Sequence, residues 1–141
     1  MKFPRIIRPG DGGRRPLLPM AKTGEWAVTG SFRYAHRDPA SLRQAELDAF
    51  KHGWLGLESF GSARLVEVAE ITPAVYEDMT RRLAAYYVAE FGVGDVNEAM
   101  AAAAEEMVFA AAQCDHPLRT VLALDREFNE QGLIERTRIA D

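Results

Sequence analysis

The stretch from Leu83 to Leu118 contains no lysine or arginine, although it carries several acidic residues. Within it, the segment from Asp95 to Cys114 is rich in alanine, the residue with the highest helix propensity, which predicts a helix. Alanine side chains leave a flat helix surface on which another element, or another copy of the chain, can pack closely. This pattern constrains how the chain packs and carries no signature of catalysis.

The chain of 141 residues has the length of one domain, so we expect residues 1–141 to form a single domain. Cys114 is the only cysteine, which excludes a disulfide within the chain. The net charge of −4 argues against general affinity for nucleic acid, whose binders carry clustered positive charge. Residues 1–22 are nevertheless basic and rich in proline and glycine, and we interpret them as an N-terminal arm. No apolar run reaches the length of a signal peptide or a membrane span, which predicts a soluble, cytoplasmic protein without a membrane partner.

Hydrophobic periodicity and turn residues predict five strands and three helices. Strands are expected at residues 3–8, 25–35, 63–71, 120–128 and 133–139, and helices at 38–52, 73–91 and 95–114. Pro39 and Pro73 each follow a capping residue at a predicted helix start, and Gly132 ends a loop typical of a hairpin. This order predicts an α+β fold, with a mainly antiparallel β-sheet of about five strands and three helices packed largely on one face.

The alternation of aromatic residues in 25–35 makes this segment the clearest strand of the sequence. Its aromatic side could stack a planar ligand in a pocket between the sheet and the helices, although core packing explains the same pattern. The residues that would line such a pocket are Trp26, Arg33, Tyr34, His36, Tyr86 and Tyr87.

Two other pairs of residues suggest chemistry. Cys114 and His116 could form a nucleophile or half of a metal site, but Cys114 lies on the predicted buried side of its helix, where a lone cysteine behaves as a small apolar residue. Asp48 and His52 are four positions apart on a predicted helix, which is also the spacing of an ordinary surface pair. We therefore predict no metal, no cofactor and no catalytic residue.

Two segments carry a resemblance to a known group of proteins. They are Gly53–Gly61, with the sequence GWLGLESFG, and the run that begins with Asp125–Asn129 and continues to Ile139. Both resemble segments of a family of small uncharacterised bacterial proteins. The resemblance implies a bacterial, cytoplasmic origin, and it carries over no activity and no site residue.

Our first functional hypothesis is a non-enzymatic accessory or assembly protein that acts through protein–protein contact, as a homodimer. Phe109 is the candidate interface residue, because it falls among the polar residues of the helix predicted at 95–114. The alternative is a small-molecule-binding protein or enzyme that uses the pocket described above. Contact of the basic arm with nucleic acid ranks last.

Overall fold

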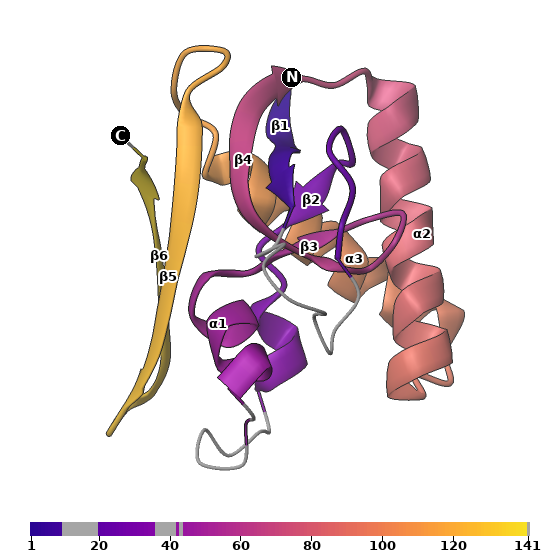
Figure 1. Ribbon diagram of the computed structural model, residues 1–141. Coiled ribbons are helices and arrows are strands. Elements are labelled where there is room, and N and C mark those ends of the chain that lie inside the picture. Colours follow the sequence, from indigo (N-terminus) through magenta and orange to yellow (C-terminus); the bar gives the residue numbers. More distant parts are fainter. Residues whose placement is uncertain (10–19, 36–41, 43, 141) are drawn as a thin grey trace.

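The computed structural model describes residues 1–9, 20–35, 42 and 44–140 (Figure 1). Along the chain the elements are β1 (Lys2–Pro9), β2 (Ala27–Val28), the short 3-10 helix η1 (Ser31–Tyr34), α1 (Gln44–His52), β3 (Trp54–Gly56), β4 (Ser62–Glu70), α2 (Pro73–Phe91), α3 (Val96–Ala112), β5 (Val121–Asn129) and β6 (Gly132–Ile139). The predicted α+β class is confirmed. The described part of the sheet has six strands rather than five, because β3 is a three-residue strand that periodicity does not resolve.

Strand β4 is the centre of the sheet, because it pairs antiparallel with three other strands. Strand β1 runs along one edge of β4. The opposite edge is divided, since residues 62–63 pair with β3 whereas residues 65–67 pair with β5. Strand β2 pairs with β3 and β6 with β5, which completes the order β2–β3–β4–β5–β6. The sheet therefore splits at Arg64, where β3 and β5 part.

The helices occupy two different places around this sheet. Helices α2 and α3 form a hairpin whose inner side packs on β1 and β2, whereas α1 lies in the split between β4 and the long β5–β6 hairpin (Figure 1). In the figure α2 stands at the right of the molecule and the β5–β6 hairpin at the left. The main core lies between the α2–α3 hairpin and the sheet, and it is the largest apolar contact of the fold.

Local sequence signals place the ends of α2 and α3. The side chain of Thr72 accepts a hydrogen bond from the backbone N–H of Val75 (3.2 Å), and Gly92 ends α2 in the left-handed conformation. The side chain of Asp95 accepts from the backbone N–H of Asn97 (2.8 Å) and begins α3. Both predicted helices are confirmed. None of the helices in the described residues is both long enough and apolar enough to cross a membrane.

The predicted helix at 38–52 is confirmed over Gln44–His52. Its predicted start at Asp38 and Pro39 lies outside the described residues, as do residues 10–19 of the predicted N-terminal arm. The predicted hairpin is confirmed, with β5 and β6 paired up to Asn129 and Gly132.

The segment 25–35, predicted as the clearest strand, is not one strand. Only Ala27–Val28 forms β2, and Ser31–Tyr34 forms η1. The chain turns at Gly30, whose φ of 79° lies in the left-handed region, and a Cβ atom there would lie 2.8 Å from the Cβ of Leu55. The prediction is wrong beyond Val28, because the alternation of apolar residues continues through this turn and does not reveal it.

Glu25 is a buried carboxylate, 3% exposed, that ties the turn before β2 to the loop after β3. It accepts hydrogen bonds from the backbone N–H groups of Lys22, Glu58 (2.9 Å) and Ser59 (2.7 Å), and from the hydroxyl of Ser59 (2.8 Å). Burial raises the pKa of this carboxyl, but the hydrogen bonds from Ser59, Lys22 and Glu58 together lower it further, so the pKa lies below its ordinary value of 4.5. The charged form of Glu25 therefore stabilises the fold.

Replacing Glu25 by glutamine should destabilise the protein by about 2–3 kcal/mol at neutral pH, because a neutral amide is a weaker acceptor and brings its own donors against N–H groups. Since the pKa of Glu25 is lowered in the folded state, its contribution is present above pH 4.5 and is lost as the pH falls through the folded-state pKa. Urea unfolding at pH 7 and at about pH 3, below the ordinary carboxyl values, should show the difference from wild type shrink with acidification.

Glu58→Gln is the matched control, because that side chain is exposed and adjacent in the loop. It should change the free energy of unfolding by less than about 0.5 kcal/mol at either pH. A Glu25→Gln penalty of equal size at both pH values would contradict the assignment.

Candidate functional site

Four of the side chains predicted to line a ligand pocket lie where η1 meets α2, and there they contact other rings. Tyr86 stacks on Phe60 with ring centroids 4.1 Å apart, and Tyr87 meets Phe32 edge to face at 4.8 Å. Burial raises the pKa of both tyrosines above the ordinary value of 10. Tyr86 and Tyr87 are thus held in an aromatic cluster between η1 and α2.

Arg33 and Tyr34 belong to the same neighbourhood. Arg33 lies over the ring of Tyr34, 5.1 Å from the centroid, and its guanidinium lowers in part the burial-raised pKa of Tyr86. Tyr34 also packs edge to face against Phe50 at 5.0 Å. Tyr34 thereby also joins a second apolar cluster, with Leu42 and Phe50.

Trp26 lies elsewhere, against Phe3 at 6.3 Å and beneath the guanidinium of Arg5 at 5.3 Å. His36 lies outside the described residues. The hollows described below are lined by other side chains, so a ligand pocket formed by this set stays a prediction.

Cys114 is buried beneath the sheet, and burial raises the pKa of its thiol to about 12 although Lys2 lowers it in part. A thiol with so high a pKa is a poor nucleophile at neutral pH. His116 contacts Cys114 through the backbone, where its N–H donates to the carbonyl of Cys114 (2.8 Å). In the part of the chain that the structure describes, no group of three or more His, Cys, Asp or Glu side chains could hold a metal ion.

Helix α3 is apolar on both of its sides. Its inner side buries Ala99, Ala103, Met107 and Ala110. On its outer side Val108 is 63% exposed and Phe109 is 44% exposed. Exposed apolar residues of this size are unusual on a helix whose other side is already buried, and they lie here beside the exposed Glu105. Phe109 lies on the exposed side, away from the buried residues, as the helical periodicity predicts.

The outer side of α3 and the adjacent side of α2 together form what we call the α2–α3 face. It contains two shallow apolar hollows. One, of about 430 Å³, lies between the helices and is lined by Arg81, Ala84, Ala85, Val88, Ala89, Val96, Ala99 and Met100. The other, of about 520 Å³, lies along α3 and is lined by Ala104, Glu105, Val108, Phe109 and Ala112. Short alanine side chains form much of the floor, and larger side chains stand beside them.

Each hollow has one charged residue in its lining, and the two charges are opposite. Arg81 lines the hollow between the helices and Glu105 lines the hollow along α3. Neither side chain forms an ion pair or hydrogen bond with another described residue; the nearby ion pair on α2 joins Arg82 and Asp78 (3.6 Å). The α2–α3 face therefore presents both signs of charge to a partner.

A second candidate is the buried ionic cluster around Arg126, which is 4% exposed. Its Nη1 donates to the carbonyl of Phe50 (2.9 Å), its Nη2 donates to the carbonyl of Thr29, and its Nε donates to the hydroxyl of Ser31 (2.9 Å). Burial lowers the pKa of Arg126 to about 10, and the carboxylate of Glu135, 3.4 Å from Nε, opposes this shift.

Glu106 of α3 completes this cluster from the other side of the Thr29–Gly30 turn. Its carboxylate accepts from the backbone N–H of Gly30 (3.0 Å) and from the hydroxyl of Thr29 (3.3 Å). Burial raises the pKa of Glu106, and the hydrogen bond from Gly30 opposes that shift. Perturbed pKa values of this kind often mark active sites. Here every nitrogen of Arg126 is directed at a protein atom, so the cluster is a structural junction.

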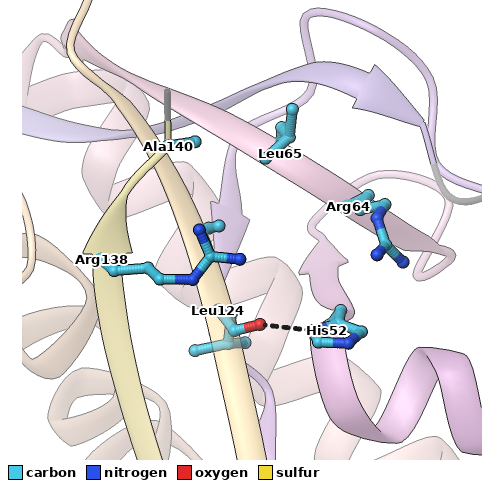
Figure 2. Close-up of a pocket in the computed structure, with 7 residues that line it drawn as sticks. His52, Arg64, Leu65, Leu124, Arg138 and Ala140 are labelled. Carbon is cyan, nitrogen blue, oxygen red and sulfur yellow. Dashed lines mark hydrogen bonds between the residues drawn. The ribbon is translucent and has the colours of Figure 1, made fainter.

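The third candidate is a polar cleft of about 200 Å³ at the split in the sheet (Figure 2). Its lining consists of His52, Arg64, Leu65, Ala123, Leu124, Arg138 and Ala140. In Figure 2, Arg138 reaches across β5 from β6, and Arg64 extends from β4 on the side of His52. The cleft exists because β4 leaves β5 at Arg64 and the end of α1 is inserted between them.

Two aspartates hold the polar side chains of the cleft. Asp48 of α1 contacts Arg64 (Oδ1 to Nη1, 2.7 Å), and Asp125 of β5 contacts Arg138 (Oδ2 to Nε, 2.7 Å). The Nδ1 atom of His52 lies 3.0 Å from the carbonyl oxygen of Leu124 and 3.2 Å from Oδ1 of Asp125. Because both neighbours are acceptors, Nδ1 carries the hydrogen and Nε2 is left as the other polar atom of the ring.

Comparison with known proteins places the chain in a family. A family model described as a family of unknown function, DUF6505, matches residues 1–141. The chain belongs to this family. No curated protein and no solved structure matches it.

In this DUF6505 protein, the two segments on which the family resemblance rests take part in the central contacts. Gly53–Gly61 supplies Ser59 to the Glu25 carboxylate, and the run from Asp125 supplies Arg126 to the buried cluster. Sequence reasoning missed the cleft, because Arg64 and Arg138 lie on separate strands far apart in the chain. It did consider His52, as a possible partner of Asp48. In the structure Asp48 forms an ion pair with Arg64 instead.

Replacing Arg126 by methionine should destabilise the protein by about 3–5 kcal/mol, because it leaves Glu135 and several backbone carbonyls buried without their cation. Urea unfolding followed by circular dichroism at neutral pH measures this change. Arg136→Met is the matched control on the adjacent strand, where the side chain is exposed, and it should cost less than about 0.5 kcal/mol. A cost below about 1 kcal/mol for Arg126→Met would contradict the junction role.

Proposed function

We propose that this protein is a non-enzymatic accessory or assembly protein that acts through protein–protein contact, beginning with a second copy of itself. The observation that carries the proposal is the α2–α3 face, in which a helix with an apolar inner side also presents an apolar outer side. Exposed apolar surface of this kind typically marks a contact site rather than a free surface.

The occupant we propose is a second copy, because the face carries both exposed large apolar side chains and an alanine-lined hollow to receive them. Val108 and Phe109 are exposed and line one hollow, whereas Ala85, Ala89 and Ala99 line the other. In a two-fold dimer the same patch is used by both copies, so a projecting side chain of each copy can enter the alanine-lined hollow of the other. Alanine permits this close approach between helices.

Charge supports the same occupant. A patch of one sign would repel its own copy, but the α2–α3 face carries Arg81 and Glu105, and neither is paired with a described residue of its own chain. Two-fold symmetry would form two Arg81–Glu105 contacts, one on each side of the axis. Each would stabilise the dimer modestly, by about 0.2–1 kcal/mol, because the groups are exposed.

The resemblance of the two segments, together with the single cysteine, supports a bacterial, cytoplasmic setting for this protein as part of the same proposal. The net charge of −4 favours protein partners over nucleic acid.

The dimer is tested by sedimentation velocity of the full chain at micromolar concentration. The wild type should sediment as a dimer, and Phe109→Glu should shift it to monomer, because a carboxylate beside Glu105 cannot enter an apolar hollow. Leu118→Glu is the matched control, since it adds the same charge at an exposed apolar residue that lines neither hollow. A wild type that remains monomeric, or equal effects of the two variants, would overturn the proposal.

A charge exchange tests the identity of the partner. Arg81→Glu and Glu105→Arg should each weaken self-association by about tenfold or more, because each puts like charges in contact in both symmetric positions. Mixing the two variants should restore association, since every cross-pair then joins an arginine to a glutamate. Association that fails to recover in the mixture would show that these residues do not meet across the interface.

A further inference from the structure

The polar cleft at the split of the sheet has features that protein–protein contact does not explain. Three side chains from three different elements, His52 of α1, Arg64 of β4 and Arg138 of β6, meet around one hollow whose floor includes Leu65 and Leu124 (Figure 2). The hollow lies among α1, β4 and β6 and shares no lining residue with the hollows of the α2–α3 face. Its chemistry has to be interpreted separately.

Each arginine of the cleft is held by one carboxylate and keeps donors to spare. Arg64 contacts Asp48 through Nη1 alone, and Arg138 contacts Asp125 through Nε alone. A guanidinium has five N–H donors in a fixed planar fork, so most donors of each arginine are not used by its aspartate. The aspartates restrict how the guanidiniums move and thereby reduce the entropy that a ligand would have to remove.

The charges of the cleft suit an anion. Arg64 and Arg138 belong to its lining, whereas the aspartates that contact them, Asp48 and Asp125, do not. His52 adds a third polar group, whose Nδ1 is fixed by Leu124 and Asp125. A tetrahedral oxyanion needs donors from several directions, and separate elements on different sides of a hollow provide them.

We propose that this cleft binds the phosphate group of a small molecule, with Arg64 and Arg138 as the binding residues. The volume of about 200 Å³ is below the roughly 300–1,000 Å³ of pockets that enclose drug-sized ligands, so the site accommodates a phosphate and few further atoms. A carboxylate is less well matched, because a single guanidinium fork already satisfies its two oxygens.

The test is isothermal titration calorimetry of the full chain with inorganic phosphate, glycerol 3-phosphate and acetate, each at the same ionic strength set with sodium chloride. Wild type should bind at least one of the two phosphate probes saturably. It should bind that probe more tightly than acetate. Arg64→Gln and Arg138→Gln should each weaken that binding by about tenfold or more, the effect of losing a charge-assisted hydrogen bond.

Arg136→Gln is the matched control, because it removes the same charge from β6 at a residue that does not line the cleft. It should leave phosphate affinity within about twofold, as expected when only screened, long-range charge is lost. Equal weakening in Arg136→Gln would overturn the site in favour of general electrostatic attraction. Absence of saturable phosphate binding, or acetate binding as tight as phosphate, would overturn it as well.

Amide chemical shifts of the wild type provide a test that needs no variant. Saturating phosphate should shift the backbone amides of residues around the cleft, above all those of His52, Leu65 and Leu124, and leave those of α2 unchanged. Shifts confined to another region of the protein would overturn the proposed location even if phosphate binds.

Discussion

A single buried guanidinium joins parts of this protein that are distant in the sequence. Arg126 lies on β5, and its donors reach the carbonyls of Ala49 and Phe50 at the end of α1 and the carbonyl of Thr29 after β2. Carbonyls at the end of a helix have no partner within the helix, and a buried cation satisfies them while opposing the negative end of the helix dipole. Since a buried charge without partners is strongly destabilising, these elements can only be arranged in ways that keep Arg126 surrounded by acceptors.

This constraint explains why the sheet splits instead of continuing. Arg126 holds α1 against β5, and beyond Leu65 the edge of β4 pairs with β3 instead of β5. Where β5 has left β4, the carbonyl of Leu124 is in contact with the ring of His52. The cleft is the space left where β4 and β5 separate, and the arginines that line it come from β4 and β6, on either side of this split. Among the hollows described above, this is the one in which arginines from two strands converge with a histidine from a helix.

Sequence reasoning predicted the elements whose ends depend on neighbouring residues, and it missed the features that depend on contacts between distant residues. Helices α2 and α3 could be predicted because their ends depend on neighbours such as Thr72 and Asp95, whose caps act over two or three residues. The turn at Gly30 could not be predicted, because distant residues stabilise it. Arg126 binds the carbonyl of Thr29 from 97 positions away, and Glu106 binds the N–H of Gly30 from 76 positions away. The aromatic residues of 25–35 pack against the cores, with Tyr34 buried and Trp26 and Phe32 partly buried, but Phe32 and Tyr34 do so from η1 rather than from a strand. The cleft could not be predicted from the sequence for the same reason, since no short-range sequence pattern indicates that Arg64 and Arg138 lie close together.

The alanine-rich helix α3 has to satisfy two surfaces at once, and this explains its composition. On its inner side, Ala99 and Ala103 let the helix backbone approach β1 and β2 closely, and Glu106 enters at the margin of the same side to bind the turn at Gly30. A lysine or arginine on the inner side would bury an unpaired charge in the apolar core, whereas a long side chain on the outer side would fill the hollow that Phe109 borders. The absence of cations from Leu83 to Leu118 is therefore consistent with a helix that is packed against its own sheet on one side and against a second chain on the other.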